Sequence, residues 1–310
     1  MTQPPLMERG RARKFPLGRV AGTLLSIGLF VYLLAAQGWG EFLQALQQLP
    51  VAYFWGGLAL MLFSRAAVTL RWYVLLRAAG LKMSLKDCAR LVFMGLFASN
   101  FLPSTVGGDL VRMAGALQLG LNAGASAASL VTDRLVGMAG MATALPLGLA
   151  AVTKTGGLTL MGVLPGWGWV REKAGRFGRS LWASLAASAR NPSGLLWALL
   201  CTYGHMLFTF ATVWLMLEGL GQPLSLWAIG GLWSFSYFVT LLPVSINGLG
   251  LQELSITYLY AHFGGVSMQT GLALAVLLRV LFLLCSLPGA AFLPDIIRPL
   301  RFSLEDKTTE

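Results

Sequence analysis

Charged residues are scarce in this chain: Asp, Glu, Lys and Arg make up only 11% of its 310 residues. A soluble domain carries about a quarter charged residues. Hydrophobic residues make up 56%, and the mean hydropathy is +0.70. Because so few polar groups cannot cover so much apolar bulk in water, the composition excludes a soluble fold and predicts an integral membrane protein.

The patterns typical of cofactor and catalytic sites are also missing. The three cysteines, Cys88, Cys201 and Cys285, are scattered and show no metal or redox spacing. His205 and His262 are isolated, and we interpret them as buried, hydrogen-bonded histidines. There is no GxxxxGK phosphate loop, so we expect no ATP hydrolysis by this chain. The sequence predicts no cofactor, no metal and no catalytic residue.

Long apolar runs are abundant instead. About 20 apolar residues can cross the ~30 Å hydrocarbon core as a helix. Such windows lie at 17–36, 51–76, 126–152, 193–217 and 267–292, with a shorter one at 157–170. Two further apolar regions, 88–119 and 225–262, are interrupted by proline and glycine. This pattern predicts an all-α polytopic membrane protein with about six full spans and two interrupted, re-entrant-like helical hairpins.

The net charge of +11 is distributed unevenly. Basic residues cluster in the tail 1–16, in the loops 77–90 and 171–190, and in the tail 298–310, whereas the connection 37–50 has no Lys or Arg. The positive-inside rule then places both termini and both basic loops in the cytoplasm. We expect a multi-pass protein of the cytoplasmic (inner) membrane, with one transmembrane domain over 17–297.

The segments 17–36 and 171–190 each allow two interpretations. The helix 17–36 is longer than the 7–15-residue core of a signal peptide, so we expect it to be retained. The basic linker 171–190 mixes arginines with apolar residues, so it either lies on the cytoplasmic leaflet and attracts anionic headgroups or serves only as a topological signal. No nucleic-acid partner is expected, because membrane topology already explains the charge.

One motif occurs twice. The stretches FLPSTVGGDLVR (101–112) and LLPVSINGLGLQE (241–253) each run Leu-Pro, a short polar segment, two glycines and then an acid, Asp109 or Glu253. The surrounding apolar segments also correspond, giving repeat 1 over 51–152 and repeat 2 over 193–292. The first repeat follows the uncharged connection and the second follows a basic loop. The two therefore enter from opposite sides and form a predicted inverted repeat.

Paired, Gly/Pro-interrupted segments are typical of secondary transporters, whose sites lie near the bilayer midplane. Unwinding at 103–108 and 243–250 would expose helix N-termini near Asp109 and Leu251, which favour anions. Glycines such as Gly108 and Gly250 would let the backbone approach a ligand. The alternative is two proline kinks that only help packing.

Ionisable residues within the predicted spans are costly and usually pair or line a pathway. Arg134 and Arg279 follow the two hairpins at similar positions and suit phosphate, although ion pairing with Asp109, Asp133 or Glu253 is an alternative that can coexist. Arg65 is a further intramembrane charge, and we interpret Arg71 as a snorkelling residue near a helix end. The candidate substrate-binding and transport residues are Asn100, Pro103, Gly107, Gly108, Asp109, Arg112, Asp133, Arg134, Asn247, Gly248, Gly250, Glu253 and Arg279.

Four motifs in this order resemble one family: RWYVLLR (71–77), SNFLPSTVGGDLVR (99–112), TDRLVG (132–137) and LPVSINGLGLQE (242–253). Together they resemble the membrane domain of the bacterial lysylphosphatidylglycerol synthase family, the flippase-like integral membrane proteins. The chain departs from that family at Ser104 and at Ile246-Asn247, where Pro-Gly turns are common. It has no room after residue 300 for the cytosolic aminoacyl-transferring domain, so lysine transfer by this chain alone is not expected.

The resemblance implies flippase-like movement of an anionic phospholipid or a lipid-linked intermediate between leaflets. Two alternatives remain at this stage. One is a membrane-embedded lipid-modifying enzyme with Asp109 or Glu253 as general base, and the other is a lipid-presenting accessory subunit of a separate glycosyltransferase or lipid-modifying enzyme. The expected partners are membrane lipids with anionic headgroups.

Overall fold

A computed structural model describes residues 49–102, 107–154, 192–241 and 248–292, together with the single positions 28, 44 and 47. Within these ranges the chain forms helices joined by turns, and no strand occurs among them. The predictions for the segments 1–16, 17–36, 157–170, 171–190 and 298–310 lie outside the described residues. The all-helical class predicted from the sequence is confirmed.

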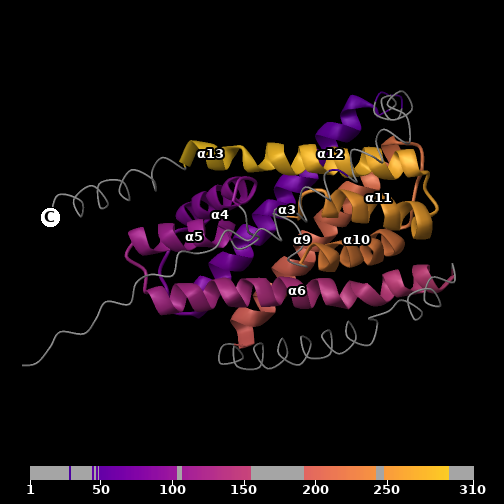
Figure 1. The fold of residues 1–310 in the computed structure, drawn as a ribbon. Coiled ribbons are helices and arrows are strands. Elements are labelled where there is room, and N and C mark those ends of the chain that lie inside the picture. The colour runs from indigo at the N-terminus through magenta and orange to yellow at the C-terminus, as the bar shows by residue number, and fades with distance from the viewer. Residues whose placement is uncertain are drawn as a thin grey trace, which may run out of the picture.

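The described helices fall into two series of the same order (Figure 1). The first comprises α3 Val51–Ala78, α4 Leu85–Ser99, α5 Gly107–Gln118 and α6 Ala123–Lys154. The second comprises α9 Pro192–Gly219, α10 Leu226–Thr240, α11 Leu251–Gly264, α12 Met268–Ser286 and α13 Pro288–Phe292. Each interrupted apolar region of the sequence thus forms a helical hairpin, α4–α5 or α10–α11.

Local capping explains where several helices begin. Ser84, Ser225 and Ser267 stand just before α4, α10 and α12, and each side chain accepts a hydrogen bond from the backbone N–H three residues later. These bonds satisfy donors that have no partner inside the first helical turn. Before α11 the chain turns at Gly250, whose φ of 76° lies in the region that favours glycine.

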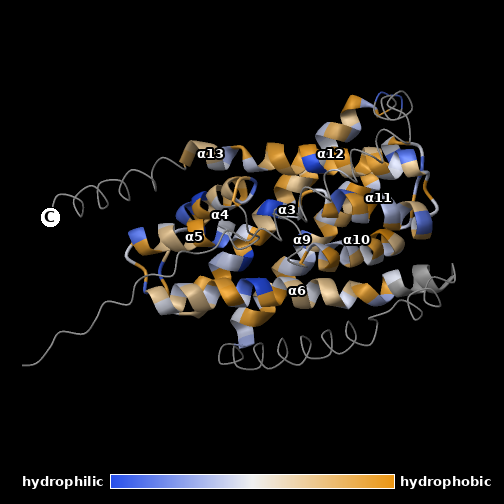
Figure 2. Ribbon diagram, viewed as in Figure 1, coloured by the Kyte–Doolittle hydropathy of each residue, from blue (hydrophilic) through white to orange (hydrophobic). Residues whose placement is uncertain are grey.

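Three of the described helices are long and apolar enough to cross a membrane: Val51–Ala78, Pro192–Gly219 and the combined Met268–Phe292. They agree closely with the predicted windows at 51–76, 193–217 and 267–292. The fourth window, 126–152, lies within α6, a 32-residue helix with Pro146 inside it. Figure 2 shows hydrophilic turns within the otherwise apolar α3, α6 and α12.

The helices of the two series pack against one another. α3 packs along α9, and each hairpin packs on a helix of the other series, α4 on the short α13 and α10 on the long α6. The last crossing is tight, because a Cβ added to Gly231 would lie 1.9 Å from the backbone N of Gly148. A Cβ added to Gly289 would lie 2.0 Å from the carbonyl O of Phe93, so α13 and α4 cross just as closely. Glycine at these positions therefore sets how near the two series approach.

Candidate functional site

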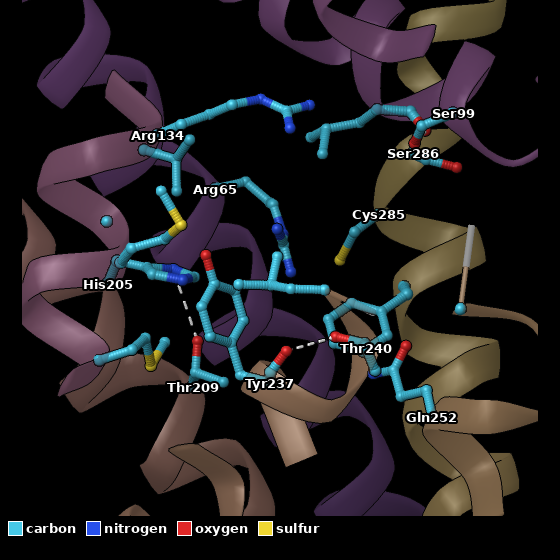
Figure 3. Close-up of a pocket in the computed structure, with 18 of the residues that line it drawn as sticks. Arg65, Ser99, Arg134, His205, Thr209, Tyr237, Thr240, Gln252, Cys285 and Ser286 are labelled. Atoms are coloured by element: carbon cyan, nitrogen blue, oxygen red, sulfur yellow. Dashed lines mark hydrogen bonds between the residues drawn. The ribbon is translucent and has the colours of Figure 1, made fainter. Parts of the chain in front are cut away.

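A cavity of about 440 Å³ lies where both helix series converge. α3, α4, α5 and α6 contribute to its wall, as do α9, α10, α12 and the start of α11 (Figure 3). The charged residues that line it are Arg65, Arg71, Asp109, Arg112, Asp133, Arg134 and Arg279. Five of these seven are arginines, so the wall of the cavity is strongly basic.

The cavity lies at the middle of two candidate membrane spans. Arg65 is 14 residues from the first residue of α3 and 13 from the last. His205 is 13 residues from the first residue of α9 and 14 from the last. At 1.5 Å per residue each is about 20 Å from either helix end. If α3 and α9 cross the bilayer, the cavity lies near its midplane.

Five of the charged residues form one alternating chain, Arg71–Asp133–Arg112–Asp109–Arg134, which we call the charge chain. Arg71 Nε donates to Asp133 Oδ1 over 2.7 Å, and Arg112 Nη1 and Nη2 both donate to Asp133 Oδ2 over 3.2 Å. Arg112 Nη1 also donates to Asp109 Oδ1 over 3.1 Å, and Arg134 Nε donates to Asp109 Oδ2. Each carboxylate thus accepts hydrogen bonds from two arginines, which lowers the cost of burying them.

Small and aromatic neighbours shape this chain. Arg71 lies across Gly137, where an added Cβ would be 3.0 Å from Nη1, and its Nη1 also donates to Thr202 over 3.4 Å. The guanidinium of Arg112 stacks 4.1 Å from the ring centroid of Trp72. Arg71 is only 7% exposed, so our interpretation of it as a snorkelling residue is wrong. Arg71 points into the protein because it pairs there with the carboxylate of Asp133 on α6.

A second ion pair joins α11 to α12. Arg279 Nε donates to Glu253 Oε1 over 2.5 Å, and Glu253 is buried. Its counterpart in the first series is the pair of Asp109 and Arg134, with a sequence separation of 25 against 26 here. Asp109 and Glu253 both stand in the first turn of their helices. Both carboxylates therefore stand near the positive end of a helix dipole, which stabilises negative charge.

Arg65 differs from the other arginines of the cavity. Its Nη2 contacts the sulfur of Met61 at 3.2 Å, and its guanidinium lies 5.1 Å from the ring centroid of Phe282. Among the described residues no carboxylate pairs with it. Arg65 is therefore a cation at the centre of α3 whose neighbours are apolar or neutral.

The two histidines have different settings. His205 Nδ1 is 2.6 Å from Ser64 Oγ, which is in turn 3.0 Å from Thr209 Oγ1. The hydrogen-bonded interpretation of His205 is confirmed, although the residue is half-buried and lines the cavity. His262 is exposed and stacks on Tyr258 with ring centroids 4.0 Å apart, so describing it as buried was wrong.

The candidate residues named from the sequence separate into three groups. Those that line the cavity are Asn100, Asp109, Arg112, Asp133, Arg134, Gly248 and Arg279. Those that do not line it are Gly107, Gly108, Gly250 and Glu253, although Glu253 accepts a hydrogen bond from Arg279. Asn100 Nδ2 donates to Ser286 Oγ over 3.0 Å and joins the end of α4 to α12. Pro103 and Asn247 lie outside the described residues.

The glycines of the first motif face protein and not the cavity. A Cβ on Gly108 would lie 2.5 Å from the carbonyl O of Gly95, and one on Gly107 would lie 2.5 Å from Leu102 Cβ. The interpretation of Gly108 as a point of ligand approach is therefore wrong, because it is needed for the close contact of α5 with α4. Among the described residues no extensive contact joins α4–α5 to α10–α11, although both line the same cavity. The tips at 103–106 and 242–247, where the hairpins were predicted to meet, lie outside the described residues.

Sequence reasoning missed several cavity residues. Arg65 was recognised as an intramembrane charge but was not proposed for the site, although a lone arginine at the centre of an apolar run is the signal that points to it. Arg71 was missed because its position near a helix end suggested a simpler role. Ser236, Tyr237, Thr240 and Gln252 carried no pattern that set them apart.

The site's chemistry favours binding of an oxyanion. A guanidinium presents a planar fork of donors that matches carboxylate or phosphate, and such charge-assisted bonds are stronger than neutral ones. The carboxylates of Asp109 and Glu253 both accept from arginines. Within the described ranges no group of three or more His, Cys, Asp or Glu side chains could hold a metal ion.

A family model described as "Lysylphosphatidylglycerol synthase TM region" matches residues 19–289. The chain belongs to this family. Family membership confirms the resemblance seen in the four sequence motifs, and the match spans both hairpins and the charge chain. As a member of the lysylphosphatidylglycerol synthase transmembrane family, the protein is membrane-embedded, and its family indicates a role connected with membrane lipids. A comparison with curated proteins finds no match.

Proposed function

We propose that this protein moves an anionic phospholipid or lipid-linked intermediate between the leaflets of the membrane. The headgroup passes through the arginine-lined cavity while the hydrocarbon tails stay in the bilayer. The observation that carries the proposal is that, among the described residues, five arginines but two carboxylates converge on one cavity. The family's connection with membrane lipids supports the same reading.

The energetic cost of these arginines argues for a function. An arginine at the bilayer centre costs about 2.5–3.5 kcal/mol by insertion scales. The ion pairs of Asp109, Asp133 and Glu253 offset part of this cost, but packing alone would be served as well by apolar residues. A cavity of about 440 Å³ suits a headgroup and falls at the low end of the range for small-molecule pockets.

The inverted repeat belongs to this proposal. The helix lengths support it, since α3 and α9 have 28 residues each and α4 and α10 have 15 residues each. The related ion pairs Asp109–Arg134 and Glu253–Arg279 support it as well. We place both termini on the cytoplasmic side of the inner membrane, and the two halves then present the cavity alternately to each leaflet, as in other inverted-repeat transporters.

Reconstitution into vesicles tests this function. A tail-labelled anionic phospholipid is incorporated, and a membrane-impermeant quencher reports how much lies in the outer leaflet. We expect the protein to make the inner-leaflet pool accessible much faster than in protein-free vesicles. Mass spectrometry of the recovered lipid should show no chemical change. Transport equal to that of protein-free vesicles would contradict the proposal. A chemically modified lipid would favour the alternative of a membrane-embedded lipid-modifying enzyme.

The double variant Glu253→Gln/Arg279→Gln tests the site within this assay. It removes one ion pair without changing the net charge, and it leaves no buried charge uncompensated. We expect transport to slow by about tenfold or more, because a charge-assisted hydrogen bond to the headgroup is lost. Arg77→Gln is the matched control, since Arg77 is exposed at the end of α3 and does not line the cavity.

A further inference from the structure

We infer that the cavity selects headgroups carrying a dianionic phosphate, a phosphomonoester or a diphosphate, and that Arg65 is the residue that receives the second negative charge. This inference rests on the proposed function and makes it more specific. It rests on a difference among the arginines that line the cavity. Among the described residues Arg65 has no carboxylate partner, whereas each of the other four has one.

Counted over the described residues, the charges at the cavity sum to plus two. The charge chain contributes three arginines and two carboxylates, which leaves +1. The pair of Arg279 and Glu253 is neutral, and Arg65 adds another +1. The two connections that complete the hairpins, 103–106 and 242–247, contain no ionisable side chain. A single negative charge would leave one cation uncompensated, whereas two balance the site.

Arg65 is placed to take part in this balance. It projects from the middle of α3 among Tyr237 and Cys285, below Arg134 in the view of Figure 3. Its contacts with a thioether and an aromatic ring leave most of its five N–H donors without an oxygen acceptor among the described residues. A phosphate oxygen would satisfy these donors and supply the missing charge.

The groups around Arg65 suit phosphate and do not suit an ammonium. His205, Thr209 and Tyr237 offer neutral polar groups in the same cavity. Every carboxylate that lines the cavity, Asp109 and Asp133, already accepts from two arginines. A zwitterionic headgroup would bring a further cation into a site that already has an excess. The cavity should therefore discriminate against such headgroups.

Lipids that differ in phosphate charge test the inference in the vesicle assay. Tail-labelled phosphatidic acid carries about two negative charges at about pH 8, and tail-labelled phosphatidylglycerol carries one. We expect the wild-type protein to move phosphatidic acid about tenfold or more faster. Arg65→Gln should reverse or abolish this preference, because the cavity then balances a single charge, while Arg65→Lys should retain a reduced preference. Arg77→Gln should leave it unchanged.

A change of preference cannot come from misfolding, which would slow both lipids alike. Equal transport of both lipids by the wild type, with an equal loss in Arg65→Gln, would overturn this inference and leave the proposed function standing. Failure to move any anionic lipid would overturn the proposed function itself. A thermal shift by inorganic phosphate as large as that by short-chain phosphatidic acid would assign the site to free phosphate and overturn the lipid assignment.

Discussion

At the scale of single residues, Asp133 holds the charge chain together. It is 2% exposed and accepts three hydrogen bonds, one from Arg71 and two from Arg112. Both arginines are also buried; Asp133 is the one carboxylate paired with Arg71 among the described residues, whereas Arg112 also pairs with Asp109. Removing one member of a buried charge network leaves the others unpaired in a medium that solvates them poorly.

We therefore expect Asp133→Asn to lower the free energy of unfolding by about 3–5 kcal/mol. The amide can still accept a hydrogen bond, but it supplies no negative charge to either arginine. Thermal unfolding of the purified protein in detergent should show a clear fall in Tm.

Asp87→Asn is the matched control for this prediction. Asp87 is a partly exposed partner of Arg90, with a closest N–O distance of 4.0 Å, and such surface pairs contribute about 0–1 kcal/mol. A fall in Tm of similar size for Asp87→Asn and Asp133→Asn would show that the charge chain is not the stabilising network described here.

At the scale of helices, glycine determines how closely the two series approach. α6 and α10 cross at Gly148 and Gly231, and α13 crosses α4 at Gly289. At each crossing the neighbour of the missing side chain is backbone, which cannot rotate away as a side chain would. The crossing at Gly148 and Gly231 sets the position of α10, whose residues form one wall of the cavity.

Gly231→Ala should therefore lower Tm, since its Cβ would lie 1.9 Å from Gly148 N and would force the helices apart. Overpacking typically costs about 1–3 kcal/mol, and contact with backbone places this variant at the upper end. Lipid transport should fall with it, because the cavity wall moves.

Gly204→Ala on α9 tests whether any added methyl group has this effect. The nearest atom to its Cβ would be Ala67 Cβ at 3.9 Å, an ordinary contact. Alanine also favours a helix over glycine by about 0.5–1 kcal/mol. Tm should therefore stay the same or rise, and an unchanged Tm in Gly231→Ala would contradict the close crossing of α6 and α10.

At the scale of the whole molecule, orientation decides whether the two series form an inverted repeat. Gln47, before α3, and Lys86, in the first turn of α4, are both exposed. Positive-inside topology puts Gln47 outside and Lys86 in the cytoplasm. In a background without Cys88, Cys201 and Cys285, Gln47→Cys should react with an impermeant maleimide in intact cells, and Lys86→Cys only after lysis. The reverse pattern would contradict the orientation, while labelling of both in intact cells would contradict the inverted repeat.

Much of the architecture was determined by the sequence itself. The windows 51–76 and 193–217 became α3 and α9 within two residues at either end, and both interrupted regions became hairpins. These features depend on local properties: hydropathy over about 20 residues, a serine before a helix, and proline or glycine where a helix ends. The family was visible for the same reason, because its motifs are short and contiguous.

The tertiary structure alone decided which charges share a cavity and which lack a partner. Arg71 meets Asp133 across 62 residues of sequence and Thr202 across 131, a juxtaposition that no local pattern contains. Gly108 faces α4 and not the cavity, since only the packed helices show which side of α5 is covered. Arg65 stands apart for the same reason: electrostatic pairing falls off over a few ångströms, so an ion pair is decided by distance in space and not by position in the chain.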